Sequence, residues 1–413
     1  MAYKKYFLYK KQYSVDGGIT WLDVEPIELT PSGQSIGTYD TYADCEEDIP
    51  SAYNRFTYQR ANGETGVSEC SNSTTFTRYP DTHDIDENYD TIKRLVIGEC
   101  IDTIGTESVG MFKVIESVDM SNSSVTTIEY KSFKPWWTTY DSTLTSVTFS
   151  TMLQSIGSEA FENCTLLRTL NFPSSLSTID NNAFKGCTGL YDITSLSGTS
   201  VTRLGLGAFQ DCTTLTKVAL PTSLRELGGY SFEGTAIRSL DLKNVTTLGT
   251  GVFANCSNLS AMTINEGTVA VPTQGFLACG SLQSVSLPST ITTIGEMAFN
   301  SCTSLTGITF SEGLLTVGNS AFANTPSMTR TVILPSTVIT LGSKIFHSSV
   351  SDVVVLATIP PTIASDTFSS AWSPYNPTYP IYVPDAAYED YSLATNWKAL
   401  ADNGRLKPLS QKP

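Results

Sequence analysis

The stretch that decides the fold covers residues 282–305 and reads LQSVSLPSTITTIGEMAFNSCTSL. It contains an alternating apolar run, a Pro-Ser turn, a second short apolar segment ending at Ile294, and Gly295. Such alternation indicates a strand with one apolar face, and the same pattern in the next unit predicts a strand over Leu305 to Phe310. We expect the glycine to adopt a positive φ at a corner of the chain.

The phenylalanine of this stretch, Phe299, recurs along the chain. From Phe161 to Phe368 there are nine steps over 207 residues, which gives a mean period of 23. Other positions keep the same phase: a cysteine three residues after the Phe, an aliphatic residue six after it, and an aliphatic residue five before it, usually followed by Gly. One such unit cannot bury its apolar face alone, so we expect stacked units that share one core.

The pattern Leu-x-x-Val-x-Leu-Pro-x-x-Ile-x-x-Ile-Gly-x-x-Ala-Phe-x-x-Cys-x-x-Leu resembles the BspA-type leucine-rich repeat of bacterial surface proteins. It covers about residues 144–370, and degenerate units centred on Phe112 and Phe133 extend it towards residue 91, with an insertion over 134–143. We therefore expect a β-rich, right-handed leucine-rich-repeat solenoid with parallel short strands and about twelve turns. The resemblance implies extracellular display and binding of proteins or host surfaces, without catalytic residues or a cofactor.

Three domains are expected: a β-rich N-terminal module (1–90), the solenoid (91–371) and a C-terminal capping segment (372–413). The capping segment, with Tyr391 and Trp397, is similar to the closing segment of that family, where a last strand and a short helix cover the open end.

The N-terminal module contains an expected β-hairpin. Its residues Ser14 to Trp21 match the Asp-box pattern Ser-x-Asp-x-Gly-x-Thr-Trp, which we interpret as a structural turn.

Charge and length exclude several classes of function. The formal net charge of −15 argues against nucleic acid and anionic membranes as partners, because phosphate binding needs clustered Lys and Arg. No apolar run approaches the ~20 residues of a membrane helix, so no membrane insertion is expected. The opening residues also lack a secretory signal, which leaves two alternatives: a signal that was removed, or a phage virion component.

Trp136, Trp137 and Tyr140 form an aromatic cluster that interrupts the repeat. Exposed aromatic side chains anchor protein interfaces and stack on sugar rings, so these three residues are the candidate ligand-binding site. The alternative interpretation is that they pack the insertion against the solenoid.

Three groups of residues are candidates for metal or thiol chemistry: an acidic segment, the histidines and the cysteines. Asp84, Asp86, Asn88 and Asp90 have the spacing of a calcium loop, but Tyr89 replaces its glycine and Leu95 its bidentate glutamate, so an acidic linker is the competing interpretation. The two histidines, His83 and His347, are expected at the surface. The cysteines that keep the repeat phase are expected to be buried free thiols, since stacked side chains rarely reach the torsion that a disulfide needs.

The leading functional hypothesis is a non-enzymatic binding or adhesion protein at the cell surface, with a protein or glycan ligand on a host or bacterial surface. Its expected display positions are Arg168, Asn171, Lys217, Asp241, Gln283 and Thr309. One alternative is a phage tail or receptor-binding component, attached to the virion through the N-terminal module. Another is a carbohydrate-active enzyme, which the Asp box suggests but for which no acid pair is evident.

Overall fold

The computed structural model describes residues 11–13, 19–21, 54–70, 75–76, 91–99, 101–135, 142–369 and 379–413. The chain divides into two compact units, Met1–Asn54 and Arg55–Pro413. In the first unit, β1 (Lys11–Tyr13) pairs antiparallel with β2 (Ile19–Trp21), which confirms the two strands of the expected hairpin. The Asp-box turn, residues 14–18, lies outside the described residues.

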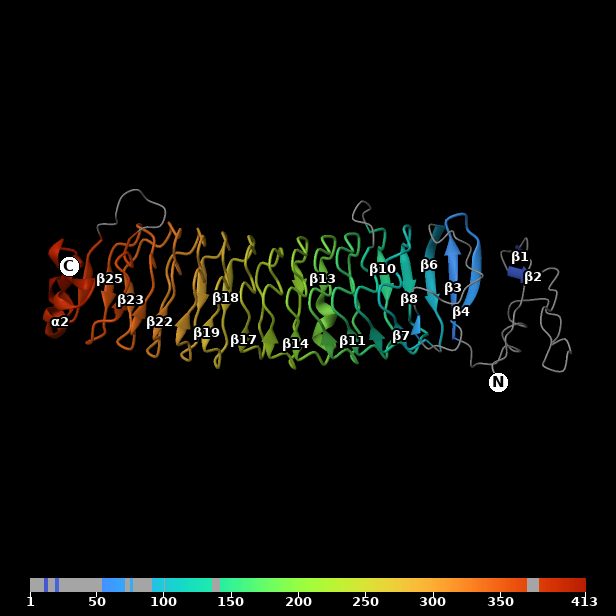
Figure 1. The fold of residues 1–413 in the computed structure, drawn as a ribbon, viewed down its shortest axis with the longest axis horizontal. Helices are drawn as coiled ribbons and strands as arrows, with labels where there is room; N and C mark the ends of the chain where they lie inside the picture. Colours follow the sequence, from blue (N-terminus) through green and yellow to red (C-terminus); the bar gives the residue numbers. More distant parts are fainter. Residues whose placement is uncertain are drawn as a thin grey trace. The chain divides into compact units, whose positions relative to one another are not determined.

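The second unit is a β-solenoid whose turns follow one another in sequence order (Figure 1). A first row holds one two-residue parallel strand per turn, in an eight-stranded and a five-stranded sheet, which together mark thirteen turns. Its strands are β5 (Thr75–Phe76), β7 (Thr103–Ile104), β9 (Thr127–Ile128), β11 (Ser155–Ile156), β12 (Thr178–Ile179), β14 (Arg203–Leu204), β16 (Glu226–Leu227), β17 (Thr247–Leu248), β19 (Ala270–Val271), β21 (Thr293–Ile294), β22 (Thr316–Val317), β24 (Thr340–Leu341) and β26 (Thr362–Ile363). The predicted stacking of short parallel strands is confirmed.

A second row of strands is broken into shorter sheets. It comprises β3 (Asn54–Arg60), β4 (Thr65–Cys70), β6 (Ile92–Ile97), β8 (Ser117–Asp119), β10 (Ser146–Thr148), β13 (Asp192–Ile193), β15 (Lys217–Val218), β18 (Ala261–Thr263), β20 (Ser284–Ser286), β23 (Val332–Leu334) and β25 (Val353–Val355), followed by two strands of the cap. At one end β3 pairs antiparallel with β6, so residues counted in the expected N-terminal module extend a solenoid sheet. The boundary expected at residue 90 stays a prediction.

The strand predicted over Leu305 to Phe310 is wrong, because this run forms no strand. The following unit is one residue longer than the mean, since 24 residues separate Phe322 from Phe346. The extra residue falls before β23. This strand pairs with β25 of the following turn and with no described strand of the preceding turn. We attribute the interruption to this change of register between neighbouring turns.

A ladder of stacked phenylalanines runs through the core. Ring centroids of successive turns lie 5.1 Å apart for Phe161–Phe184, 5.5 Å for Phe253–Phe276 and 5.3 Å for Phe276–Phe299, with planes tilted by at most 21°. All of these rings are fully buried. The predicted shared interior is therefore confirmed, and the aromatic column fixes the register of the turns.

The glycine that precedes the Phe does not adopt the predicted positive φ. The left-handed residue stands two positions later, for example Ser320 after Gly318, with φ 53°. Glycine is required for a different reason: a Cβ on Gly318 would lie 2.6 Å from the backbone nitrogen of Glu296 in the preceding turn. The prediction was therefore wrong about the cause, which is the close approach of two turns.

Turns after the second row follow the predicted Pro-Ser/Thr pattern. Leu176 donates its backbone N–H to the carbonyl of Pro173, at 3.1 Å, and closes the turn. The hydroxyl of Ser175 donates to the carbonyl of Leu153 in the preceding turn, at 2.7 Å. The small hydroxyl residue thus bonds neighbouring turns where no strand exists.

The C-terminal cap consists of β27 (Ile381–Val383), the 3₁₀ segment η3 (Asp385–Ala387), the helices α2 (Tyr388–Leu393) and α3 (Trp397–Asp402), β28 (Leu406–Pro408) and η4 (Leu409–Gln411). Strand β27 pairs parallel with β25, and β28 with β27. Trp397 is fully buried, and its Nε1 donates to the carbonyl of Pro361 at 2.7 Å. The predicted closing strand and helix are confirmed.

Candidate ligand-binding surface

The predicted aromatic site, Trp136, Trp137 and Tyr140, lies outside the described residues and stays a prediction. The structure does describe the base of this insertion. The Lys134 ammonium lies 2.6 Å from carboxylate oxygens of both Glu159 and Glu162 in the next turn. These ion pairs raise the pKa of Lys134 against the opposing effect of its partial burial. Sequence analysis missed this three-residue contact, because the partners are 25 and 28 residues away.

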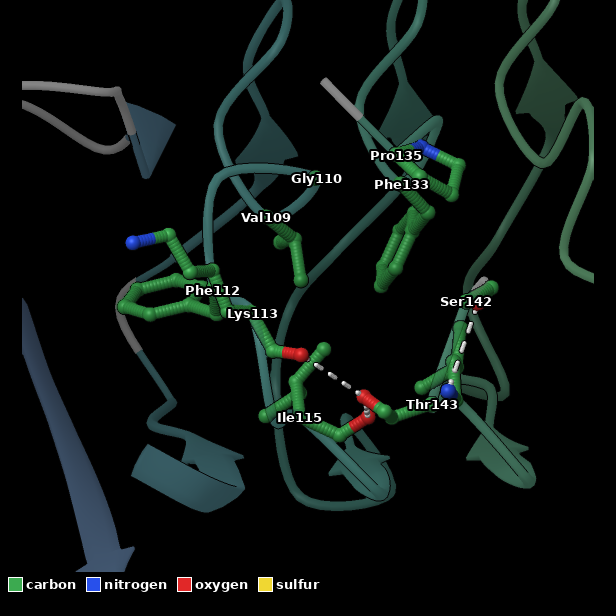
Figure 2. Close-up of a pocket in the computed structure, with 10 residues that line it drawn as sticks. Val109, Gly110, Phe112, Lys113, Ile115, Phe133, Pro135, Ser142 and Thr143 are labelled. Atoms are coloured by element: carbon green, nitrogen blue, oxygen red, sulfur yellow. Dashed lines mark hydrogen bonds between the residues drawn. The ribbon is translucent and has the colours of Figure 1, made fainter. Parts of the chain in front are cut away.

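A hollow lies beside the same base (Figure 2). Its lining includes Val109, Phe112, Phe133 and Thr143, and the Thr143 hydroxyl donates to the carbonyl of Ile115 at 2.7 Å. The space measures about 20 Å³, room for one water molecule, far below the ~300 Å³ at which ligand pockets begin. This hollow is therefore too small to be a ligand site by itself.

A larger hollow, about 440 Å³, lies between the last turn and the cap. Phe368, Asn396 and Arg405 contribute to its lining. The Arg405 guanidinium donates to the carbonyl of Phe368, at 3.2 Å, and to that of Tyr379, at 3.3 Å. The polar groups at this hollow thus hold the cap in place.

The solenoid exterior bears out the predicted division between buried and displayed positions. The ladder phenylalanines and the six phased cysteines are buried, whereas the six predicted display residues are exposed: Arg168, Asn171, Lys217, Asp241, Gln283 and Thr309. Opposite charges on this exterior pair across neighbouring turns, as Arg203 does with Glu226 at 2.8 Å. Exposed pairs of this kind contribute little stability, so the surface can vary without loss of the fold.

The phased cysteines offer no reactive group. Six of them, Cys164, Cys187, Cys212, Cys256, Cys279 and Cys302, are free and buried, as predicted. Their thiols donate to the carbonyl of the ladder Phe in the preceding turn, for example from Cys279 to Phe253 at 3.0 Å. Burial raises the pKa of Cys164 to about 12, so its thiol stays protonated and unreactive at neutral pH.

The predicted histidine and metal positions are only partly described. His347 is half-buried rather than exposed, its Nδ1 accepts the backbone N–H of Ser349 at 3.1 Å, and burial lowers its pKa. His83 and the calcium-loop candidates Asp84 to Asp90 lie outside the described residues. Within the described ranges no group of three His, Cys, Asp or Glu side chains is arranged to hold a metal ion. Over those same ranges no helix has the length and apolar character to span a membrane.

The stacked 23-residue turns, the buried Phe ladder and the polar exterior define a leucine-rich-repeat solenoid. A family model, the BspA type leucine rich repeat region, matches residues 138–260 and 242–354, more than half of the chain. The chain belongs to this family, as its resemblance indicated.

Solved structures with a similar fold include a leucine-rich repeat protein from Bacteroides ovatus, 20% identical with a TM-score of 0.40, covering 67% of this chain and 93% of that one. A leucine rich cell surface protein from Faecalibacterium prausnitzii is 22% identical with a TM-score of 0.39, covering 74% and 94%. The pneumococcal vaccine antigen PcpA is 16% identical with a TM-score of 0.35, covering 77% and 83%. No curated protein matches the chain.

Proposed function

We propose that this protein is a non-catalytic binding protein, displayed at a bacterial cell surface, whose solenoid exterior holds a protein or glycan ligand. The observation that carries the proposal is the separation of roles along each turn. Ladder positions repeat one residue type and are buried, while exposed positions such as Arg168, Gln283 and Thr309 differ from turn to turn. A fixed scaffold with a variable exterior is how repeat proteins acquire binding specificity.

The family supports the same proposal, since the chain matches the BspA-type repeat over residues 138–354. The phased thiols are buried, and the hollow beside Phe133 holds about one water molecule. The larger hollow beside Phe368 has no Cys, His, Asp or Glu among the described residues of its lining. The virion alternative stays a prediction, because the N-terminal module that would attach to a virion is described only over short segments.

Binding of the purified full chain to a glycan array and to fixed bacterial and epithelial cells tests the proposal. We expect saturable binding, with the bound glycan recovered at unchanged mass. Thr309→Arg on the second row and Thr340→Arg on the first row are matched variants, since both threonines are exposed. Only the variant on the binding row should reduce the signal. Absence of saturable binding, or cleavage of the bound glycan, would contradict the proposal.

A further inference from the structure

In the middle turns of this acidic molecule, cationic side chains balance the acidic ones. Residues 168–243 contain seven Lys or Arg and six Asp or Glu, a net charge of +1 in a chain of net charge −15. No Lys or Arg follows from residue 244 to residue 329. The middle turns of the solenoid are therefore the part of its repeat surface best suited to an anionic partner.

Three of these cations lie along the second row within two turns of the exposed Tyr191, and the ammonium of one of them, Lys217, lies over its ring. Tyr191 is 39% exposed, its backbone N–H donates to the carbonyl of Arg168, and its own carbonyl accepts from the N–H of Lys217. Arg168, Tyr191 and Lys217 thus occupy three consecutive turns, and Arg238 is exposed in the fourth. With turns ~4.8 Å apart, Arg168 and Arg238 lie ~14 Å from each other along the row.

The contacts within this group leave charge available. The Lys217 ammonium lies 5.5 Å from the centre of the Tyr191 ring and 3.6 Å from an oxygen of Asp192. Asp192 also accepts the backbone N–H of Thr194 at 3.0 Å, which holds the carboxylate in place. Arg168 and Arg238 are exposed and lie within 4 Å of no described carboxylate. Guanidinium groups of this kind bind carboxylate or sulfate oxygens in pairs.

We infer that Arg168, Tyr191, Lys217 and Arg238 form a binding site for an anionic polysaccharide. Its carboxylate or sulfate groups would pair with the cations, and the apolar face of a sugar ring would pack on Tyr191. The inference rests on the proposed function and adds the class of ligand.

An acidic peptide is less well matched to these residues. Protein partners bind through apolar or aromatic side chains that enter desolvated pockets. Around Tyr191 the exposed neighbours Thr169, Thr194 and Thr216 present hydroxyl groups instead. Hydroxyl groups along a flat row match the repeated hydroxyls of an extended sugar chain.

Biolayer interferometry with the full chain tests the inference. The probes are hyaluronan, which carries carboxylates, chondroitin sulfate, which carries carboxylates and sulfates, dextran as a neutral polymer and polyglutamate as an acidic peptide. We expect binding to one or both anionic glycans, at least tenfold weaker in 500 mM than in 50 mM NaCl, and none to dextran. Equal binding of the two glycans would show that carboxylates suffice, and a preference for chondroitin sulfate would show that sulfates contribute.

Matched variants locate the site. We expect the double variant Arg168→Ser, Arg238→Ser to bind at least tenfold more weakly, and Arg330→Ser, at another exposed arginine, to stay within twofold of the parent. Tyr191→Ser should also weaken binding, whereas Tyr191→Phe keeps the ring and the affinity. Tyr130→Ser is the control, since Tyr130 is 41% exposed and also lies beside a lysine.

Three results would overturn the inference: no binding to either anionic glycan, equal binding of polyglutamate, or unchanged affinity in the double variant. The cell-binding assay separates this outcome from failure of the proposed function. A chain that binds cells but neither glycan retains the proposed function and loses only the anionic ligand. Thermal unfolding of each variant verifies that the fold is intact.

Discussion

At the residue scale, each recurring position of the repeat has one physical role. The ladder Phe fills the core, the cysteine thiol donates to the carbonyl of the preceding turn, and the glycine allows two backbones to approach. Each of these residues contacts the adjacent turn. A substitution at one of them is therefore expected to weaken the contact between two turns.

Gly318→Ala tests the close approach of turns. The added methyl group would lie 2.6 Å from the backbone nitrogen of Glu296, so the turn must shift, at a cost of about 1–3 kcal/mol. Gly307→Ala is the matched control, because no atom lies within 4 Å of its added carbon. Thermal unfolding should show a clearly lower stability for Gly318→Ala and little change for Gly307→Ala. An equal loss of stability in both variants would show that glycine is needed at position 318 for its backbone flexibility rather than for the space it leaves.

Alkaline pH tests the buried thiols. Burial raises the pKa of Cys302 to about 12, so above about pH 9 the unfolded chain releases a proton that the folded chain retains. Stability contributed by this thiol is thus complete below pH 9 and declines as the pH rises towards 12. We expect the difference in unfolding free energy between the parent and Cys302→Ala to shrink by about 1.4 kcal/mol per pH unit in that window.

Thr325→Ala is the control for this measurement. Thr325 stands at the cysteine position of its turn, is buried, and donates to the carbonyl of Phe322 at 2.7 Å, but it does not titrate in this range. Its stability difference from the parent should stay constant from pH 8 to pH 11. A constant difference for Cys302→Ala as well would mean that this thiol is accessible in the folded chain.

At the scale of elements, the cap closes the row that ends in β25. An uncovered parallel strand offers free backbone groups to another chain, which leads to association. Strands β27 and β28 extend that sheet, while Trp397 packs against Tyr391, with ring centroids 4.7 Å apart. The cap therefore combines backbone pairing with aromatic packing.

Trp397→Ala should cost about 3–5 kcal/mol, since it empties a fully buried site and removes the hydrogen bond to Pro361. We also expect concentration-dependent association in size-exclusion chromatography, because a loosened cap uncovers β25. Leu393→Ala is the control in the same cap, since Leu393 is 72% exposed and should be replaceable at no measurable cost. A monomeric, stable Trp397→Ala variant would show that other contacts hold the cap.

At the scale of the whole solenoid, core packing joins each turn to the turns on either side, and the Tyr230 hydroxyl also donates to Gln274 Oε1 two turns away, at 3.5 Å. Phe276 stacks on Phe253 and Phe299 and on no third member of the ladder. The stability of such an array is close to a sum over neighbouring turns. Damage to one turn is therefore expected to stay local.

Phe276→Ala tests this locality by hydrogen exchange. Loss of the ring should reduce protection in the turns of β19 and β21, next to the cavity, and leave the cap around Trp397 protected. The cavity itself should cost about 3–5 kcal/mol. Loss of protection at equal rates over the whole solenoid would contradict the local model and indicate one cooperative unit.

The sequence by itself determined the repeat, its buried positions and its cap, because a periodic apolar pattern has one stable solution, the stacking of equal units. It also identified Arg168 and Lys217 as display residues, which stand one and two residues after the ladder leucines Leu167 and Leu215. The 24-residue spacing behind the interruption after Leu305 also stands in the sequence. The reason for the glycine and the contact of Lys217 with the Tyr191 ring were decided by the tertiary structure alone. These features depend on which atoms of one turn meet the next, and residues about 23 positions apart become neighbours only once the turns have stacked.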